Sequence, residues 1–221
     1  MHIGHLTYRR RTGPARPGAV VAVVAGLCTL GVGMLVVRGG EVPAAEEGAF
    51  RALNDLPDGL YAFAWPFQQL GALLVGPVVA LVALALRRYR LALAALIVTA
   101  AKLVGERAVK AVVSRERPGT SIGPDVRMRG DVHLAGESFV SGHAVLVAAL
   151  AGVVTPYLRG RWRLVPWALV GGVMVGRVYV GAHNPLDVVC GAALGIAVAG
   201  AVHLATGAAR RPVAPRQEVL R

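Results

Sequence analysis

The sequence has few charged residues for its length. Only 16% of its 221 residues are Asp, Glu, Lys or Arg, whereas 55% are hydrophobic, and the mean hydropathy is +0.58. A soluble domain of this length would need far more polar surface, so the composition indicates a membrane protein. A membrane-spanning helix takes roughly 20 apolar residues. The chain therefore has room for five or six spans, which is one membrane domain.

Cysteines and acidic residues are also scarce. Cys28 and Cys190 lie in apolar stretches without metal-ligand spacing, so we expect two small buried residues and no disulfide framework. The 12 acidic residues face 24 Lys and Arg, which gives a net charge of +12. Such a surplus is typical of nucleic-acid binding. Here, however, the basic residues flank apolar spans rather than one soluble face, so no nucleic-acid partner is expected.

Six apolar segments follow one another, and they predict an all-α membrane protein with six transmembrane helices. We place them at residues 19–37, within 60–86, and at 91–113, 139–158, 164–182 and 185–209. The second segment contains prolines, and its amphipathic start suits the membrane interface. Residues 1–18 form a basic segment, residues 19–209 the membrane domain, and residues 210–221 a tail that we expect to be disordered.

The distribution of arginine predicts the orientation. Four segments, namely the N-terminus, two links between spans and the tail, hold fourteen arginines and one acid, Glu218. These segments alternate along the chain, so they share one side of the membrane, and the positive-inside rule makes both termini cytoplasmic. The arginines are Arg9, Arg10, Arg11, Arg16, Arg87, Arg88, Arg90, Arg159, Arg161, Arg163, Arg210, Arg211, Arg216 and Arg221.

The first apolar segment has two interpretations. Val42-Pro43-Ala44 weakly resembles the cleavage site of a signal peptide. The apolar run is longer than the usual core of a signal, which favours a membrane anchor. Cleavage would leave the orientation of the other spans unchanged.

Charged residues gather near the outer end of the third segment. Charges in a membrane helix are costly, and they are usually functional or paired. Lys102, Glu106 and Lys110 are four residues apart, so they share a helix face and predict an ion ladder that positions Lys110. Arg117-Pro118 follows within roughly two helical turns. Taken alone, Lys110 is better explained as a side chain that reaches to the outer interface.

The fourth and sixth segments begin with residues that suit anion chemistry. Ser141 is a candidate helix N-cap, and Gly142 would let an anion approach the free N–H groups of the helix start. His143 alone would be a core histidine. Asp187 falls in the first turn after Asn184-Pro185, where it can accept the ring N–H of His183. The alternative for that pair is a charge pair at a helix end.

Taken together, these segments resemble the type 2 phosphatidic acid phosphatase family, the membrane relatives of the vanadium haloperoxidases. The resemblance covers about residues 60–205. The family's three motifs are K-x6-R-P, P-S-G-H and S-R-x5-H-x3-D. Their matches here are Lys110, Arg117 and Pro118; Ser141, Gly142 and His143; and Arg177, His183 and Asp187.

Two positions depart from the family pattern. Val140 stands where the family usually has proline, and Gly176 where it usually has serine, which removes one hydroxyl contact to phosphate. Neither change removes a group that the chemistry requires. They leave the rate and the substrate preference more open than the type of reaction.

The resemblance implies a role for each matched residue. His183 would attack phosphorus and form a phosphohistidine, Asp187 would orient it, and His143 would protonate the leaving oxygen and then activate water. The phosphate would be held by Lys110, Arg117, Ser141, Gly142 and Arg177. Asp187 is the only carboxylate within the motifs, so we expect no metal and no cofactor. The loop 119–137 would be either a lid that contacts the headgroup or a solvated connector.

The expected function is that of an integral membrane phosphatase of a bacterial plasma membrane, with its site on the extracytoplasmic face. The implied substrates are lipid phosphates: a polyprenyl diphosphate such as undecaprenyl or decaprenyl diphosphate, used in cell-wall synthesis, phosphatidic acid or phosphatidylglycerophosphate. The alternatives are a non-enzymatic lipid transporter or scaffold with the same fold, a phosphatase of soluble substrates, and a haloperoxidase. A lipid-flux assay without phosphate release would favour the transporter.

Overall fold

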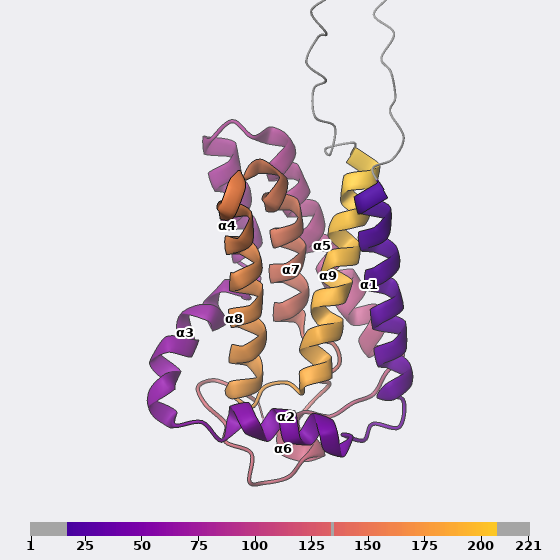
Figure 1. Cartoon of the computed structure of the whole chain (residues 1–221), viewed down its shortest axis with the longest axis vertical. Helices are drawn as coiled ribbons and strands as arrows, with labels where there is room; N and C mark the ends of the chain where they lie inside the picture. The colour runs from indigo at the N-terminus through magenta and orange to yellow at the C-terminus, as the bar shows by residue number, and fades with distance from the viewer. Residues whose placement is uncertain (1–16, 134, 207–221) are drawn as a thin grey trace, which may run out of the picture.

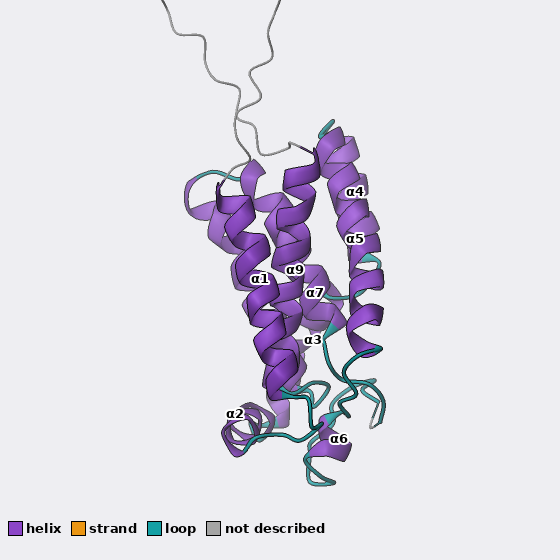
Figure 2. Ribbon diagram, turned by 90° about the vertical axis from the view of Figure 1, so that its right-hand side faces the viewer, coloured by secondary structure: helices purple, strands orange, loops and turns teal. Residues whose placement is uncertain are grey.

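The computed structural model describes residues 17–133 and 135–206, which form a bundle of helices with no strand in this part of the chain (Figures 1 and 2). The all-α prediction is therefore confirmed for these residues. The predictions for the basic N-terminal segment and for the tail fall almost wholly outside them. The elements are α1 (Pro17–Val36), α2 (Ala44–Asn54), η1 (Asp58–Leu60), α3 (Tyr61–Leu70), α4 (Val75–Ala85), α5 (Tyr89–Lys110), α6 (Pro118–Ser121), α7 (Gly142–Val154), η2 (Thr155–Tyr157), η3 (Gly160–Leu164), α8 (Val165–Tyr179) and α9 (Pro185–Thr206).

The close packing of α7 against α9 forms the centre of the bundle. A Cβ atom at Gly191 of α9 would lie 2.7 Å from the carbonyl oxygen of Ser141, and one at Gly195 would overlap the carbonyl oxygen of Val145. Small residues at these positions let the two helix backbones approach closely. The start of α7 is therefore held beside the start of α9, where the backbone N–H of Ser141 donates to the carbonyl of Asp187 at 3.0 Å.

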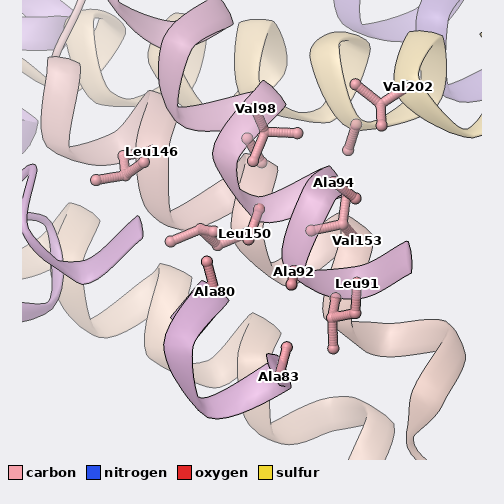
Figure 3. Packing of buried hydrophobic residues seen from close by; sticks show 13 residues of the cluster. Ala80, Ala83, Leu91, Ala92, Ala94, Val98, Leu146, Leu150, Val153 and Val202 are labelled. Atoms are coloured by element: carbon pink, nitrogen blue, oxygen red, sulfur yellow. The ribbon is translucent and has the colours of Figure 1, made fainter. Parts of the chain in front are cut away.

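Aliphatic side chains fill the bundle away from these helix starts. Figure 3 shows a buried cluster in which α4, α5, α7 and α9 meet. Burial of apolar surface of this kind stabilises the arrangement of the helices, and thus the positions of their polar ends. The labelled members are Ala80, Ala83, Leu91, Ala92, Ala94, Val98, Leu146, Leu150, Val153 and Val202.

The candidate residues lie at the opposite end of the bundle. The end of α5, the start of α7 and the turn between α8 and α9 meet there, and α2 lies across this end (Figure 1). The start of α1 and the end of α9 lie together at the other end. In α2, Glu46 and Phe50 are buried, so the helix covers the bundle with one face.

Within the residues that the structure describes, two helices, α1 and α9, are each long and apolar enough to cross a membrane. A third candidate span consists of two parts: η1 with α3, and α4. These two parts are bent by 66° relative to each other at the break between Leu70 and Val75. The other predicted spans contain helices that are shorter or carry more charge, so the count of six spans and their direction stay predictions. The expectation that both cysteines are buried is wrong for Cys28, which is exposed on α1, whereas Cys190 is buried.

Candidate active site

The predicted ion ladder is present at the end of α5. Glu106 accepts from Lys102 at 2.7 Å and from Lys110 at 2.8 Å. The helix ends at Lys110, and residues 111–117 continue without a regular helix to Arg117, which precedes α6. The carboxylate of Glu106 also lies against Gly142, where a Cβ atom would overlap it. The ladder therefore places the ammonium group of Lys110 next to the start of α7.

Ser141, Gly142 and His143 start α7, as predicted. Ser141 occupies the N-cap position, but its side chain makes no capping bond, and its hydroxyl is buried without a partner among the described residues. The predicted N-cap is therefore confirmed in its position, but the predicted capping hydrogen bond is not formed. The ring of His143 packs against Gly71, because any Cβ atom at Gly71 would overlap it. Gly71 thus allows the junction of α3 and α4 to lie directly beside this histidine.

His183 and Asp187 are both buried in the turn between α8 and α9 and at the start of α9. Their closest approach is 3.7 Å, between Nδ1 of His183 and Oδ2 of Asp187, which is longer than a hydrogen bond. Ser138 lies between them. Its hydroxyl donates to Oδ2 of Asp187 at 2.5 Å and is 3.3 Å from Nδ1 of His183. The predicted contact is thus relayed by a serine.

Arg115 holds the other oxygen of Asp187. The guanidinium group donates to Oδ1 of Asp187 at 2.9 Å and makes a bidentate pair with Glu46 of α2. All three side chains are almost completely buried. Glu46 also accepts the backbone N–H of Leu186 at 2.8 Å, and Asp187 accepts that of Asn184 at 2.8 Å. These bonds fix the Asp187 carboxylate from several sides.

Arg117, His143 and Arg177 line a cavity of about 340 Å³ at this end of the bundle. One N–H of Arg117 donates weakly to the carbonyl oxygen of Ala182 at 3.5 Å, directly before His183. Three residues that line this cavity each have one buried nitrogen without a hydrogen-bond partner within the described ranges. These nitrogens are Gln68 Nε2, Arg117 Nε and Arg177 Nε. All three are N–H donors, so the cavity suits an anion with several oxygens.

The electrostatic environment keeps His183 neutral. Burial lowers the pKa of His183 to about 4, since it penalises the charged ring, and the positive charges of Arg177 and Arg117 act in the same direction. Asp187 opposes this shift but does not cancel it. At neutral pH the ring therefore has an unprotonated nitrogen, which is the state a nucleophile needs.

The described residues of the loop 119–137 pack against the site. Asn54 bonds the backbone of Arg127 with both ends of its amide. The buried Arg129 bonds Asp58 and the carbonyl oxygens of Asn54, Leu56 and Tyr179. Its guanidinium group lies 4.2 Å from the ring centre of Tyr179. The loop is thereby tied to α2 and η1. Three residues after Arg129 reach the cavity wall: Asp131, Val132 and His133.

The sequence patterns missed four residues of this region. Arg115 lies within the first motif, two positions before Arg117, and that proximity was a usable signal. Ser138 is close to the second motif and carries a hydroxyl. Glu46 and Gln68 come from α2 and α3, far from any motif, and no local spacing identifies them.

The space that Gly176 leaves open is filled by Gln68. A Cβ atom at Gly176 would lie 2.5 Å from Nε2 of Gln68, and the amide oxygen of Gln68 accepts a bond of 2.9 Å from Arg177. Gly172, one turn earlier on α8, gives the same kind of room to the ring of Phe67. Helix α3 therefore packs closely against α8 at these two glycines.

Two solved structures share this fold. The crystal structure of Aquifex aeolicus LpxE matches with a TM-score of 0.65 and 24% identity, over 75% of this chain and 98% of its own. The crystal structure of a transmembrane PAP2-type phosphatidylglycerolphosphate phosphatase from Bacillus subtilis matches with a TM-score of 0.68 and 19% identity, over 86% of this chain and 98% of its own. A comparison with curated proteins gave no significant match.

The family model of the PAP2 superfamily matches residues 89–211, which is more than half of the chain and includes all three motifs. The resemblance in the motifs, the shared fold and this match agree. The chain therefore belongs to the PAP2 superfamily, the type 2 phosphatidic acid phosphatases.

Proposed function

We propose that this protein is an integral membrane phosphatase that removes phosphate from a lipid phosphate or diphosphate. The observation that carries the proposal is the cavity at one end of an apolar bundle, where Arg117, Arg177 and His143 face a common space. His183 is buried behind this lining, and it is near enough for the charges of Arg177 and Arg117 to act on it. Two fixed cations suit the charge that spreads over the oxygens of a transferring phosphoryl group. Arginine adds planar, bidentate contacts to such oxygens.

The reaction proposed here has two steps. Nε2 of His183 attacks phosphorus and forms a P–N bond, while the P–O bond to the lipid breaks and His143 gives a proton to the leaving oxygen. A water molecule then gives a proton back to His143 and attacks phosphorus, which breaks the P–N bond and releases orthophosphate. Asp187 and Ser138 lie on the Nδ1 side of His183, which leaves Nε2 for the attack.

The remaining motif residues would bind the phosphoryl oxygens. Lys110 is held by Glu106 beside the start of α7, where the hydroxyl of Ser141 and the N–H of Gly142 are also located. The free N–H groups of a helix start favour an anion. No group of three or more His, Cys, Asp or Glu residues in the described ranges could hold a metal ion. The proposed reaction uses none.

A lipid substrate is favoured by the wall of the cavity. Tyr61 and Trp65 of α3 line it, and Trp65 and Phe63 are half or more exposed on the outside of the same helix. Aromatic side chains of this kind prefer the membrane interface. The proposed substrates are undecaprenyl or decaprenyl diphosphate, phosphatidic acid and phosphatidylglycerophosphate, with a plasma-membrane location, cytoplasmic termini and an extracytoplasmic site. The phosphatidylglycerolphosphate phosphatase of Bacillus subtilis, which shares the fold, supports the lipid class.

The test is phosphate release by the purified protein from a panel of these lipids in detergent micelles, with and without a chelator. We expect release from at least one lipid, unchanged by the chelator, and a loss of at least about 1,000-fold in His183→Ala, since the nucleophile is removed. Full activity of His183→Ala would overturn the mechanism. A strict need for metal would overturn the metal-free reaction.

A further inference from the structure

Helix α3 brings polar and apolar groups directly to the proposed active site, although it lies outside residues 89–211 that match the family. Its end at Gly71 contacts the ring of His143, and Gln68 contacts Arg177. Gln68 also lines the same cavity as Arg117, His143 and Arg177. No motif includes this helix, so these contacts are what connects it to the chemistry.

The orientation of the Gln68 amide follows from its bond to Arg177. A guanidinium group can only donate, so the oxygen of the amide faces NH1 of Arg177 at 2.9 Å. The other end of the amide, Nε2, is a donor that is buried and has no partner in the described part of the chain. A buried donor without a partner costs free energy, so it needs a reason to be retained.

The site supplies such a reason. The Nε group of Arg177 is also buried without a partner, so Gln68 and Arg177 together present unpaired N–H groups. These two residues lie on the wall of one cavity, whose other cation is Arg117. Oxygens of a phosphate group would satisfy donors at these positions. Gly176 makes the arrangement possible, because any side chain there would meet Nε2 of Gln68.

We propose that Gln68 is a substrate-binding residue: its amide oxygen orients Arg177, and its Nε2 group donates a hydrogen bond to an oxygen of the bound phosphate group. This proposal rests on the function proposed above, because it names a further residue of the same site. The side chain of Gln68, which belongs to α3, fills the space beside Gly176 of α8 and places its Nε2 donor there.

The experiment measures the binding of orthophosphate to the purified protein in detergent by calorimetry. In Gln68→Ala the dissociation constant should rise about tenfold, as expected for the loss of one hydrogen bond to a charged group. A serine hydroxyl introduced at position 176 of α8, which faces the side chain of Gln68, should reverse this loss. We therefore expect the double variant Gln68→Ala with Gly176→Ser to bind orthophosphate within about threefold of the wild type, which is well inside the effect of one such bond.

The matched control is Gln68→Ala with Gly176→Ala, which fills nearly the same volume without a hydroxyl. It should bind as weakly as Gln68→Ala alone. A second control, Phe63→Leu, changes an exposed residue on the outside of α3 and should leave binding unchanged. Thermal unfolding of each variant shows that the helices still pack. The proposal is overturned if Gln68→Ala binds like the wild type, or if the serine variant binds no better than the alanine variant.

Lipid phosphate hydrolysis is assayed separately on the same variants. If the wild type binds orthophosphate through Gln68 but releases none from any lipid, the proposed function fails and the role of Gln68 in phosphate binding stands. If lipids are hydrolysed and the dissociation constant does not depend on Gln68, only the inference about Gln68 fails.

Discussion

Two clusters of charged side chains flank the proposed site, and they differ in both burial and chain separation. The Glu106 cluster consists of Lys102, Glu106 and Lys110, and its side chains are 12–23% exposed. The Arg115 cluster consists of Glu46, Arg115 and Asp187, and its side chains are at most 5% exposed. Fully buried charges depend on complete pairing, whereas pairs that remain partly exposed contribute less. The Arg115 cluster should therefore be far more sensitive to the loss of one partner.

The largest effect is expected for Arg115→Met, which keeps an apolar stem of similar length but removes the charge. Glu46 and Asp187 would then be buried without a cation, and breaking a buried pair costs about 3–5 kcal/mol. We expect a marked fall in the midpoint of thermal unfolding in detergent and a loss of almost all phosphate release. Both quantities can be measured on one preparation.

A double variant separates the two roles of Arg115. Adding Glu46→Gln to Arg115→Met removes the uncompensated charge of Glu46, so much of the thermal stability should return. Activity should not return, because Asp187 still lacks the cation that holds its Oδ1 atom. A wild-type unfolding midpoint and wild-type activity in Arg115→Met alone would show that the Arg115 cluster is not essential to either.

The two clusters also show how far sequence patterns reach. The Glu106 cluster is local, with members four residues apart on one helix, so its spacing predicted the contacts that the structure shows. The Arg115 cluster joins residues that are 69 and 72 positions apart. No periodicity in the sequence predicts such a pairing, because it arises only when α2 packs across the end of the bundle where α5 and α8 end and α7 and α9 begin (Figure 1).

The same distinction applies to the fold. Apolar runs predicted where the helices of the bundle lie, since each run is continuous in the chain. The bend of 66° between α3 and α4, and the seating of α3 on Gly172 and Gly176, depend on contacts with α8 and on the turn at Gly71. They could not be predicted, and they are what brings Gln68 to the site.

An intermediate effect is expected within the Glu106 cluster when its two lysines are compared. Lys110→Met should lower kcat/KM for lipid phosphate release about 100-fold, as for the loss of one donor to a developing oxyanion. Lys102→Met removes the other cation from the same carboxylate, two helical turns of α5 before Lys110 and outside the three motifs. It should change kcat/KM by no more than about threefold, a loss typical of a partly exposed pair.

The comparison of the lysines has a clear contrary outcome. Equal losses in the two variants would mean that Lys110 acts through the ladder rather than on the phosphate. Lys110→Arg helps to distinguish these, because it keeps the charge and the pair with Glu106 but changes the shape of the donor. A partial recovery of kcat/KM in Lys110→Arg supports direct contact with the substrate.

The smallest effect is expected for Glu106→Gln. The amide keeps an acceptor for one lysine, and partly exposed ion pairs contribute at most about 1 kcal/mol, so the unfolding midpoint should fall only slightly. KM for the lipid should rise about threefold, because Lys110 loses part of the interaction that holds it beside Gly142. The matched control is Glu47→Gln, which breaks a pair with Arg51 of the same spacing on α2, away from the cavity. It should not change KM. If Glu106→Gln destabilises the protein as much as Arg115→Met does, burial is not what separates the two clusters.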